Sequence, residues 1–448
     1  MRLLADQPIE SMTEDGLGRA PFVESLRRAL ESSETPFVYG LLGEWGSGRT
    51  SALRLLEARL RQEREAATSA LVPVWLNARQ YENEVNQIYP LLYALRQAYQ
   101  GDRRITALAG ARGFGGMLAR VAATSALAGS DAALRGATRN LAAEALPLKE
   151  LREQLEAVRQ QPENLEGLLR GWADTIMQLR SGFEALLGTF ASDLARADPR
   201  LKVEDVRFAI LIDDLDRCAP EHARMLLENL RQFLTVRRAV FVLAINAPAL
   251  AQTLAGADRA GANAGRQYLE TVLNGSLHLP EPALEQVQRL ARQQIERGLE
   301  VESAEPDQKA VLERGISEGA QALEEGRVGN PRQLKRVLNR YVMFIDQHAA
   351  NLDQFSLGNI ARLLAIAETE PGLFQAFTTN AERASADLAN LGAPEFSLPV
   401  FEAAHGVSAR APYARLAARR RLFQFEVNAD KPGLQQQVNE VDALVRWS

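Results

Sequence analysis

Two short stretches of the chain combine residue types that can bind and activate a phosphate group. The first, residues 43–50, reads GEWGSGRT and fits the pattern G-x-x-x-x-G-K-[ST], except that Arg49 stands in place of lysine. Glycines let the backbone approach an anion closely, so that its N–H groups and the positive end of a following helix bind phosphate oxygens. A plain connecting turn is the alternative. The apolar run before this stretch and the helical pattern after it favour phosphate binding.

We expect the bound molecule to be a triphosphate with Mg²⁺. Thr50 offers a hydroxyl that can ligate Mg²⁺, and the cation of Arg49 would reach the β- and γ-phosphates. Arginine keeps the charge of lysine but not its compact shape, so we expect binding with slow hydrolysis, and faster hydrolysis after Arg49→Lys. The residues expected around the phosphates are Gly43, Glu44, Trp45, Gly46, Ser47, Gly48, Arg49, Thr50 and Ser51.

The second stretch, residues 207–218, reads RFAILIDDLDRC. Its apolar run is typical of a strand buried on both faces, and the run breaks abruptly into Asp213, Asp214 and Asp216. In an open parallel sheet, ligands bind at the carboxyl ends of the strands. We therefore expect Asp213 to hold Mg²⁺ and Asp214 to orient or deprotonate the attacking water. A solvated turn is the alternative for three acids in four residues.

Two further residues are candidates for the same site. Asn246 ends an apolar run, where its side chain could contact the γ-phosphate or the attacking water, or could equally cap the chain as it leaves the strand. Arg332 follows Pro331 at the start of a helical pattern and could lean over the phosphates, with a solvated helix face as the alternative. The candidate catalytic residues are thus Asp214, Arg49, Asn246 and Arg332.

The elements that must position these residues alternate between strand and helix up to about residue 280, and only helical patterns follow. The sequence therefore predicts an α/β fold in which helices flank a parallel sheet, with a helical insert and a C-terminal helical lid domain. The expected divisions are an N-terminal helical segment at 1–35, a core in two parts at 36–100 and 201–280, an insert at 101–200, a lid at 281–392 and a helical tail at 393–448.

Composition narrows the class of protein. The 448 residues suggest two or three domains, and the net charge of −5 disfavours a general nucleic-acid coat. Cys218 is the single cysteine, which excludes an intramolecular disulfide and multi-cysteine zinc sites and fits a reducing cytoplasm. The nearest approach to a membrane span, residues 105–129, is interrupted by Arg112 and Arg120, so a small-residue helical insert is the favoured interpretation.

Six stretches follow one another along the chain: GEWGSGRTS, LNARQYEN, LIDDLDRCAPE, FVLAIN, YLETVLNGSLHLP and GNPRQLKRVLN. In this order and at these separations they resemble the KAP family of P-loop NTPases. The resemblance covers roughly residues 10 to 345, and DDLDRC followed by PE is its most specific part. It implies an ATPase of the additional-strand class with a helical lid, in a family whose bacterial members are in some cases linked to phage exclusion.

The leading hypothesis is a cytoplasmic ATP-binding protein that hydrolyses ATP slowly and uses its nucleotide state to change shape or assembly, in phage defence. Its partners would be copies of itself or an effector protein, without a membrane span. The alternative is a pseudo-ATPase that serves as a scaffold for a partner effector. Nucleic-acid binding rests only on the basic residues between Arg410 and Arg421, and the net negative charge speaks against it.

Overall fold

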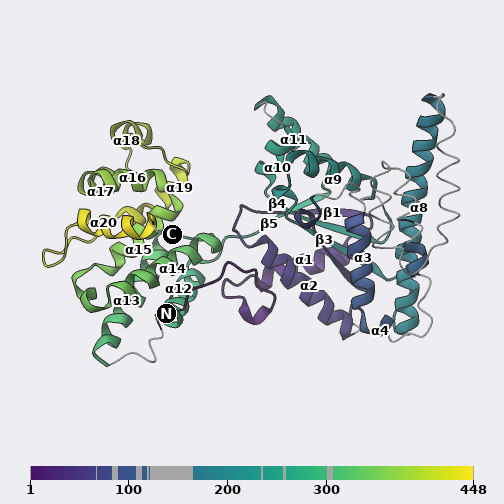
Figure 1. The fold of residues 1–448 in the computed structure, drawn as a ribbon, viewed down its shortest axis with the longest axis horizontal. Helices are drawn as coiled ribbons and strands as arrows, with labels where there is room; N and C mark the ends of the chain where they lie inside the picture. Colours follow the sequence, from purple (N-terminus) through teal and green to yellow (C-terminus); the bar gives the residue numbers. More distant parts are fainter. Residues whose placement is uncertain are drawn as a thin grey trace. The chain divides into compact units, whose positions relative to one another are not determined.

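The structure is a computed structural model that describes residues 2–66, 68–82, 89–106, 114–118, 121, 165–233, 236–255, 259–299 and 306–446. Its contacts divide the chain into two compact units, each described by itself below (Figure 1). The sheet-containing unit comprises Ala20–Glu44 and Arg49–Leu279. The helical unit comprises Met1–Arg19, Trp45–Gly48 and Pro280–Ser448.

A five-stranded parallel sheet forms the centre of the sheet-containing unit in the described part of the chain, with the order β2-β3-β4-β1-β5. The fourth strand along the chain is thus inserted between the strand that enters the glycine-rich stretch and the strand that ends in the aspartates. This inserted strand confirms the predicted additional-strand arrangement. The strands are β1 (Phe37–Leu42), β2 (Leu71–Asn77), β3 (Arg207–Asp213), β4 (Ala239–Ile245) and β5 (Gly275–His278).

The apolar content of each strand explains its place. All seven residues of β4 are buried, as expected for a strand covered on both faces. Pro73 lies in β2, which is an edge strand and therefore tolerates a residue without a backbone N–H. In the register, Leu42 pairs with Ile245 and Asn77 pairs with Asp213, so the strands deliver their following loops to one edge of the sheet.

Helices cover this sheet and extend from it. α2 packs on β2, β3 and β4, and α3 packs on β2. The long α8 stands at one side of the unit in Figure 1 and contacts the core through Phe190, whose ring centroid lies 5.1 Å from that of Phe208. The helices are α1 (Ala20–Ser32), α2 (Arg49–Glu65), α3 (Tyr89–Gly101), α4 (Arg103–Thr106), α8 (Leu165–Ala197), α9 (Pro220–Phe233), α10 (Ala247–Ala255) and α11 (Arg259–Val272), with short 3₁₀ turns η2 (Ala78–Tyr81) and η3 (Leu215–Arg217).

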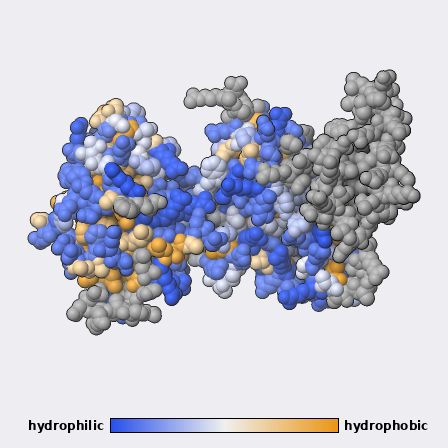
Figure 2. All heavy atoms as spheres, viewed as in Figure 1, coloured by the Kyte–Doolittle hydropathy of each residue, from blue (hydrophilic) through white to orange (hydrophobic). Residues whose placement is uncertain are grey.

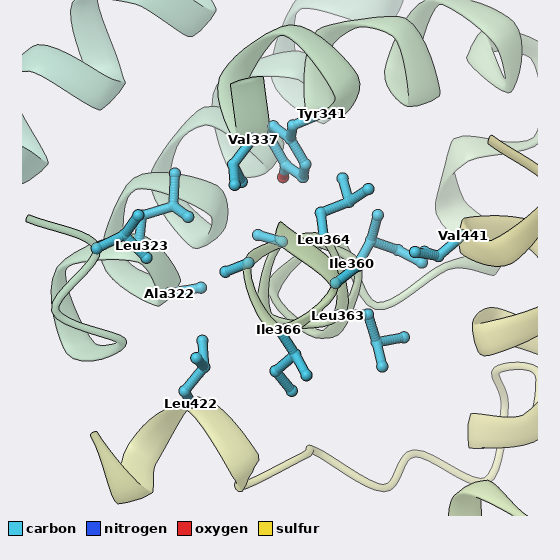
Figure 3. Close-up of a cluster of buried hydrophobic side chains, with 14 of the residues drawn as sticks. Ala322, Leu323, Val337, Tyr341, Ile360, Leu363, Leu364, Ile366, Leu422 and Val441 are labelled. Atoms are coloured by element: carbon cyan, nitrogen blue, oxygen red, sulfur yellow. The ribbon is translucent and has the colours of Figure 1, made fainter. Parts of the chain in front are cut away.

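The helical unit is built around α15 (Leu357–Thr369), which is buried along almost its whole length. Figure 3 shows its leucines and isoleucines pointing in several directions, toward side chains of α13, α14, α20 and η6. A helix that is apolar on all sides belongs at the centre of a bundle. The other helices and 3₁₀ turns described in this unit are η1 (Met12–Glu14), α12 (Leu284–Leu299), α13 (Pro306–Glu325), α14 (Pro331–Gln347), η5 (Ala349–Gln354), α16 (Pro371–Thr379), α17 (Ala381–Ala389), α18 (Leu398–His405), α19 (Tyr413–Ala418), η6 (Arg420–Phe423) and α20 (Leu434–Arg446).

Apolar side chains are scattered over the visible surface. On the face seen in Figure 2 the coloured residues are mainly hydrophilic, and the hydrophobic ones gather in small separate areas. In the described parts of the chain, no helix combines the length and the apolar character that a membrane span requires. Most of the stretch 105–129 lies outside the described residues, so the interpretation of that insert stays a prediction.

Candidate functional site

The glycine-rich stretch forms a tight loop between β1 and α2. Gly43 N–H donates to Ile245 O at 3.3 Å, which joins the start of the loop to the end of β4. Gly46 and Gly48 have φ of 84° and 97°, a region that side chains rarely adopt, and α2 begins immediately afterwards at Arg49. The predicted succession of strand, loop and helix is confirmed.

Three carbonyl groups of this loop accept hydrogen bonds from other parts of the helical unit. Asn330 Nδ2 donates to Trp45 O at 2.9 Å, Arg332 N to Gly46 O at 3.3 Å, and Arg19 Nη2 to Ser47 O at 3.0 Å. These three hydrogen bonds direct the carbonyl groups toward Asn330, Arg332 and Arg19 and limit the conformations that the loop can adopt. Phosphate binding by the N–H groups of this loop stays a prediction.

Asn330 has two functions in this arrangement. Its amide nitrogen contacts the loop. Its Oδ1 accepts from Arg332 N at 3.1 Å and so caps the start of α14, whose first residue is Pro331. Sequence reasoning did not identify Asn330 or Arg19 as site residues. An Asn directly before a Pro is a helix-start signal, but it does not reveal that the same side chain contacts the phosphate loop.

Arg49 is fixed by a buried ion pair. Its Nη2 lies 2.9 Å from Asp216 Oδ2, and the two side chains are 6% and 0% exposed. The same carboxylate oxygen accepts from Asn246 N at 3.0 Å. Asp216 Oδ2 therefore connects Arg49, the substituted residue of the phosphate loop, to Asn246 at the end of β4. Sequence reasoning assigned no role to Asp216.

Thr50 and Asp213 lie together, as the sequence predicts for the two Mg²⁺ ligands. The Thr50 hydroxyl donates to the Asp213 carboxylate, which is 2% exposed. Burial, together with the charge of Asp214, raises the pKa of Asp213, and the Thr50 hydrogen bond opposes this rise. Asp213 Oδ2 is buried and has no hydrogen-bond partner among the described residues.

These two residues fit a magnesium ion. Mg²⁺ is commonly held by one or two carboxylates together with phosphate oxygens and water, and does not need a cage made of protein alone. The described residues contain no group of three or more His, Cys, Asp or Glu side chains that could hold a metal. The Asp213 oxygen and the Thr50 hydroxyl are oxygen donors of the kind that Mg²⁺ accepts as ligands.

Asp214 stands in a strained backbone conformation, with φ 57° and ψ 23°. Asp is one of the few residue types that visit this left-handed region, and such strain occurs often at functional sites. Its Oδ2 accepts from Asn77 Nδ2 at 3.1 Å, and its Oδ1 lies 2.9 Å from Arg217 Nε. Both partners orient the carboxylate at the carboxyl edge of β2 and β3.

The other two candidates have different surroundings. Asn246 Oδ1 accepts from Ala249 N at 3.3 Å, which favours the capping alternative for this side chain, at the start of α10. Arg332 pairs with Asp6, with 2.6 Å between Nε and Oδ2, in the helical unit. The structure thus brings Arg49, Thr50, Asp213 and Asp214 together at the sheet edge and gives the Arg332 side chain a carboxylate partner.

Cys218 offers a direct test of the electrostatics beside the acidic stretch. Burial and the nearby charges of Glu82, Asp214 and Asp216 raise the pKa of its thiol to about 11. Because the thiolate is the reactive form, alkylation by iodoacetamide should be slow at neutral pH and should keep rising roughly tenfold per pH unit beyond the ordinary thiol value of about 8.5. A rate that levels off near that ordinary value contradicts this prediction. Mass spectrometry over a pH series measures it cleanly, since the chain has one cysteine.

The sheet order, the glycine-rich loop after β1 and the carboxylates after β3 together define a P-loop NTPase fold. Within that class, the model of the KAP family P-loop domain matches residues 19–345, and the chain belongs to this family. The resemblance stated from the six stretches is confirmed.

Two solved structures match the chain at low identity and with low TM-scores. The Aeropyrum pernix ORC2 protein, in ADPNP–ADP complexes, is 15% identical over 98% of this chain and 95% of its own, with a TM-score of 0.35. The Aeropyrum pernix ORC1 protein in complex with DNA is 14% identical over 94% of each chain, with a TM-score of 0.32. No curated protein matches the chain.

Proposed function

We propose that this chain binds ATP with Mg²⁺ and hydrolyses it slowly, and that the nucleotide state changes its shape or its assembly with copies of itself or with an effector protein. The observation that carries the proposal is the pair formed by Thr50 and Asp213, whose buried Oδ2 has no partner in the described part of the chain. The family resemblance extends the proposal to a place in bacterial phage defence.

Each residue has a separate task in this proposal. The nest at residues 43–48 binds the phosphates through backbone N–H groups. Thr50 and Asp213 would hold Mg²⁺, which would neutralise charge on the phosphate oxygens. Asp214 orients the attacking water and accepts its proton. The guanidinium of Arg49 is already engaged by Asp216, so it adapts less readily than an ammonium group to the changing phosphate geometry, which accounts for slow turnover.

The hydrogen bonds of the loop support the conformational part of the proposal. Trp45 O and Gly46 O accept from Asn330 Nδ2 and Arg332 N at the first turn of α14. A loop that tightens around a triphosphate and relaxes after hydrolysis would shift these carbonyls, and α14 would have to follow or release them. The start of α14 would therefore change its position or its contacts when the conformation of the phosphate loop changes.

Calorimetry with a non-hydrolysable ATP analogue and a Mg²⁺-dependent phosphate-release assay test the proposed function. Binding together with slow release supports it. Binding without any release, at all enzyme concentrations, identifies the chain as the pseudo-ATPase scaffold. Absence of analogue binding, with and without Mg²⁺, excludes the nucleotide-dependent function altogether.

Asp213→Asn should separate metal binding from folding. We expect the Mg²⁺-dependent part of analogue affinity to fall by at least about tenfold, because a ligand to the ion is lost. Thr50→Ser keeps the hydroxyl and is the matched control, with affinity close to that of the original chain. Calorimetry with and without Mg²⁺ gives both values, and unchanged Mg²⁺ dependence in Asp213→Asn contradicts the assignment.

The same substitution should stabilise the nucleotide-free protein at neutral pH. The folded-state pKa of Asp213 is raised, so above it the buried charge costs stability. This cost shrinks as the pH falls from the folded-state pKa of Asp213 toward the ordinary carboxyl pKa. Asn carries no charge. The Tm of Asp213→Asn should therefore exceed that of the original chain at neutral pH without Mg²⁺, and the difference should shrink in acid; calorimetric melting over a pH series checks both.

A further inference from the structure

Asp216 occupies an unusual position for an acidic residue. Its side chain is completely buried, and its Oδ2 accepts from both Arg49 Nη2 at 2.9 Å and Asn246 N at 3.0 Å. The backbone contact fixes the carboxylate to the end of β4, next to β1 in the sheet. Arg49 is thus attached to a rigid part of the core and not to the acids proposed to bind Mg²⁺ and water.

The second terminal nitrogen of the Arg49 guanidinium, Nη1, has different surroundings from Nη2. Arg49 Nη1 is buried, and no residue of the described chain accepts a hydrogen bond from it. An unsatisfied buried donor on a cation is costly unless an anion completes its contacts. Since Arg49 is the first residue of α2, directly after the phosphate loop, a nucleotide phosphate is the anion that this position can receive.

The ion pair should persist when nucleotide binds. Removing one partner of a buried ion pair leaves an uncompensated charge in the core, which is far more costly than the loss of an exposed pair. The planar fork of arginine can donate to two different acceptors at its two ends, so Arg49 can keep Asp216 on Nη2 while Nη1 serves a phosphate.

We propose that Asp216 is a positioning residue that holds Arg49 by one end of its guanidinium, so that the other end contacts a terminal phosphate of the triphosphate. This inference rests on the proposed MgATP function and adds to it the device by which arginine replaces lysine in this loop. A compact ammonium group reaches the phosphates without such an anchor, because its three donors share a single nitrogen.

Asp216→Asn tests the anchor with little change of shape, since Asn Oδ1 can still accept from Asn246 N. The probes are ADP and a non-hydrolysable ATP analogue, both with Mg²⁺, measured by calorimetry. We expect the preference for the analogue over ADP to fall roughly tenfold, the worth of a charge-assisted hydrogen bond, while ADP affinity stays within about twofold. Asp205→Asn, at an exposed position, is the control.

Arg49→Lys supplies the second half of the test. The double variant with Asp216→Asn should recover the analogue preference to within about threefold of Arg49→Lys alone, because lysine does not need the anchor. Thermal melting of all variants identifies loss of fold; an unfolded Asp216→Asn whose fold returns in the double variant also supports a pair specific to arginine.

Three outcomes overturn the proposal. In the first, Asp216→Asn prefers the analogue over ADP as strongly as the original chain does. In the second, Asp216→Asn lowers this preference equally with and without Arg49→Lys. In the third, neither Asp216→Asn nor the double variant folds. In these cases, measurable analogue binding by the original chain leaves the proposed function intact. If the original chain binds neither probe, the proposed function fails as well.

Discussion

Asp214→Asn is expected to abolish Mg²⁺-dependent phosphate release while leaving analogue affinity within about threefold. The substitution removes a base and keeps the size of the side chain. Asn tolerates the left-handed backbone of this residue, and its Oδ1 can still accept from Asn77 Nδ2. The phosphate nest is built from other residues, so binding should not depend on this carboxylate.

The matched control for this prediction is again Asp205→Asn, which removes an exposed carboxylate shortly before β3. It should release phosphate at the rate of the original chain. If Asp214→Asn also turns over at that rate, Asp214 does not activate the water. A loss of affinity comparable to the loss of turnover would instead place Asp214 among the nucleotide-binding residues.

The sheet was predictable because each strand is marked by a short continuous segment of sequence. The apolar runs of β1, β3 and β4 are contiguous, and each is followed by the polar residues that mark its carboxyl end. Once those ends are aligned, Thr50, shortly after β1, and Asp213, at the end of β3, are expected at the same edge of the sheet, although β4 lies between the two strands. Their side-chain hydrogen bond agrees with that expectation.

The ion pair of Arg49 was not predictable from such patterns. Its partner Asp216 is 167 positions away in sequence and is separated from the phosphate loop by the whole insert. Three acids after a strand offer three possible partners, and only the 3₁₀ turn after Asp214 directs the third one inward. For the same reason the contact between Asn330 and Trp45, 285 positions apart, has no signature in the sequence.

This pair changes the expectation for Arg49→Lys. From the sequence alone a gain of hydrolysis is expected, because every other position of the loop fits the usual pattern. In the structure, Asp216 is buried around a guanidinium, and lysine would leave that carboxylate with a different and less complementary partner. We therefore do not expect Arg49→Lys alone to raise the rate of ATP hydrolysis.

Gly46→Ala should weaken analogue binding at least about tenfold more than Gly48→Ala. Both glycines have positive φ, so alanine costs roughly 1–2 kcal/mol of backbone strain at either position. Gly46 lies much closer to α14 than Gly48 does. A Cβ there would lie 2.6 Å from Asn330 Oδ1 and 2.8 Å from Arg332 Cβ, whereas a Cβ at Gly48 would have its nearest neighbour at 3.8 Å, in Pro331.

The clash at Gly46 acts on the contacts that hold the loop. Asn330 cannot move away without giving up Trp45 O or the first N–H groups of α14, so either the nest or the helix start is disturbed. Calorimetry on both variants, with thermal melting to confirm folding, measures the difference. Equal losses of affinity would mean that strain alone matters and that α14 does not hold the loop in the nucleotide-bound state, which would remove the structural support for a nucleotide-driven change at this helix.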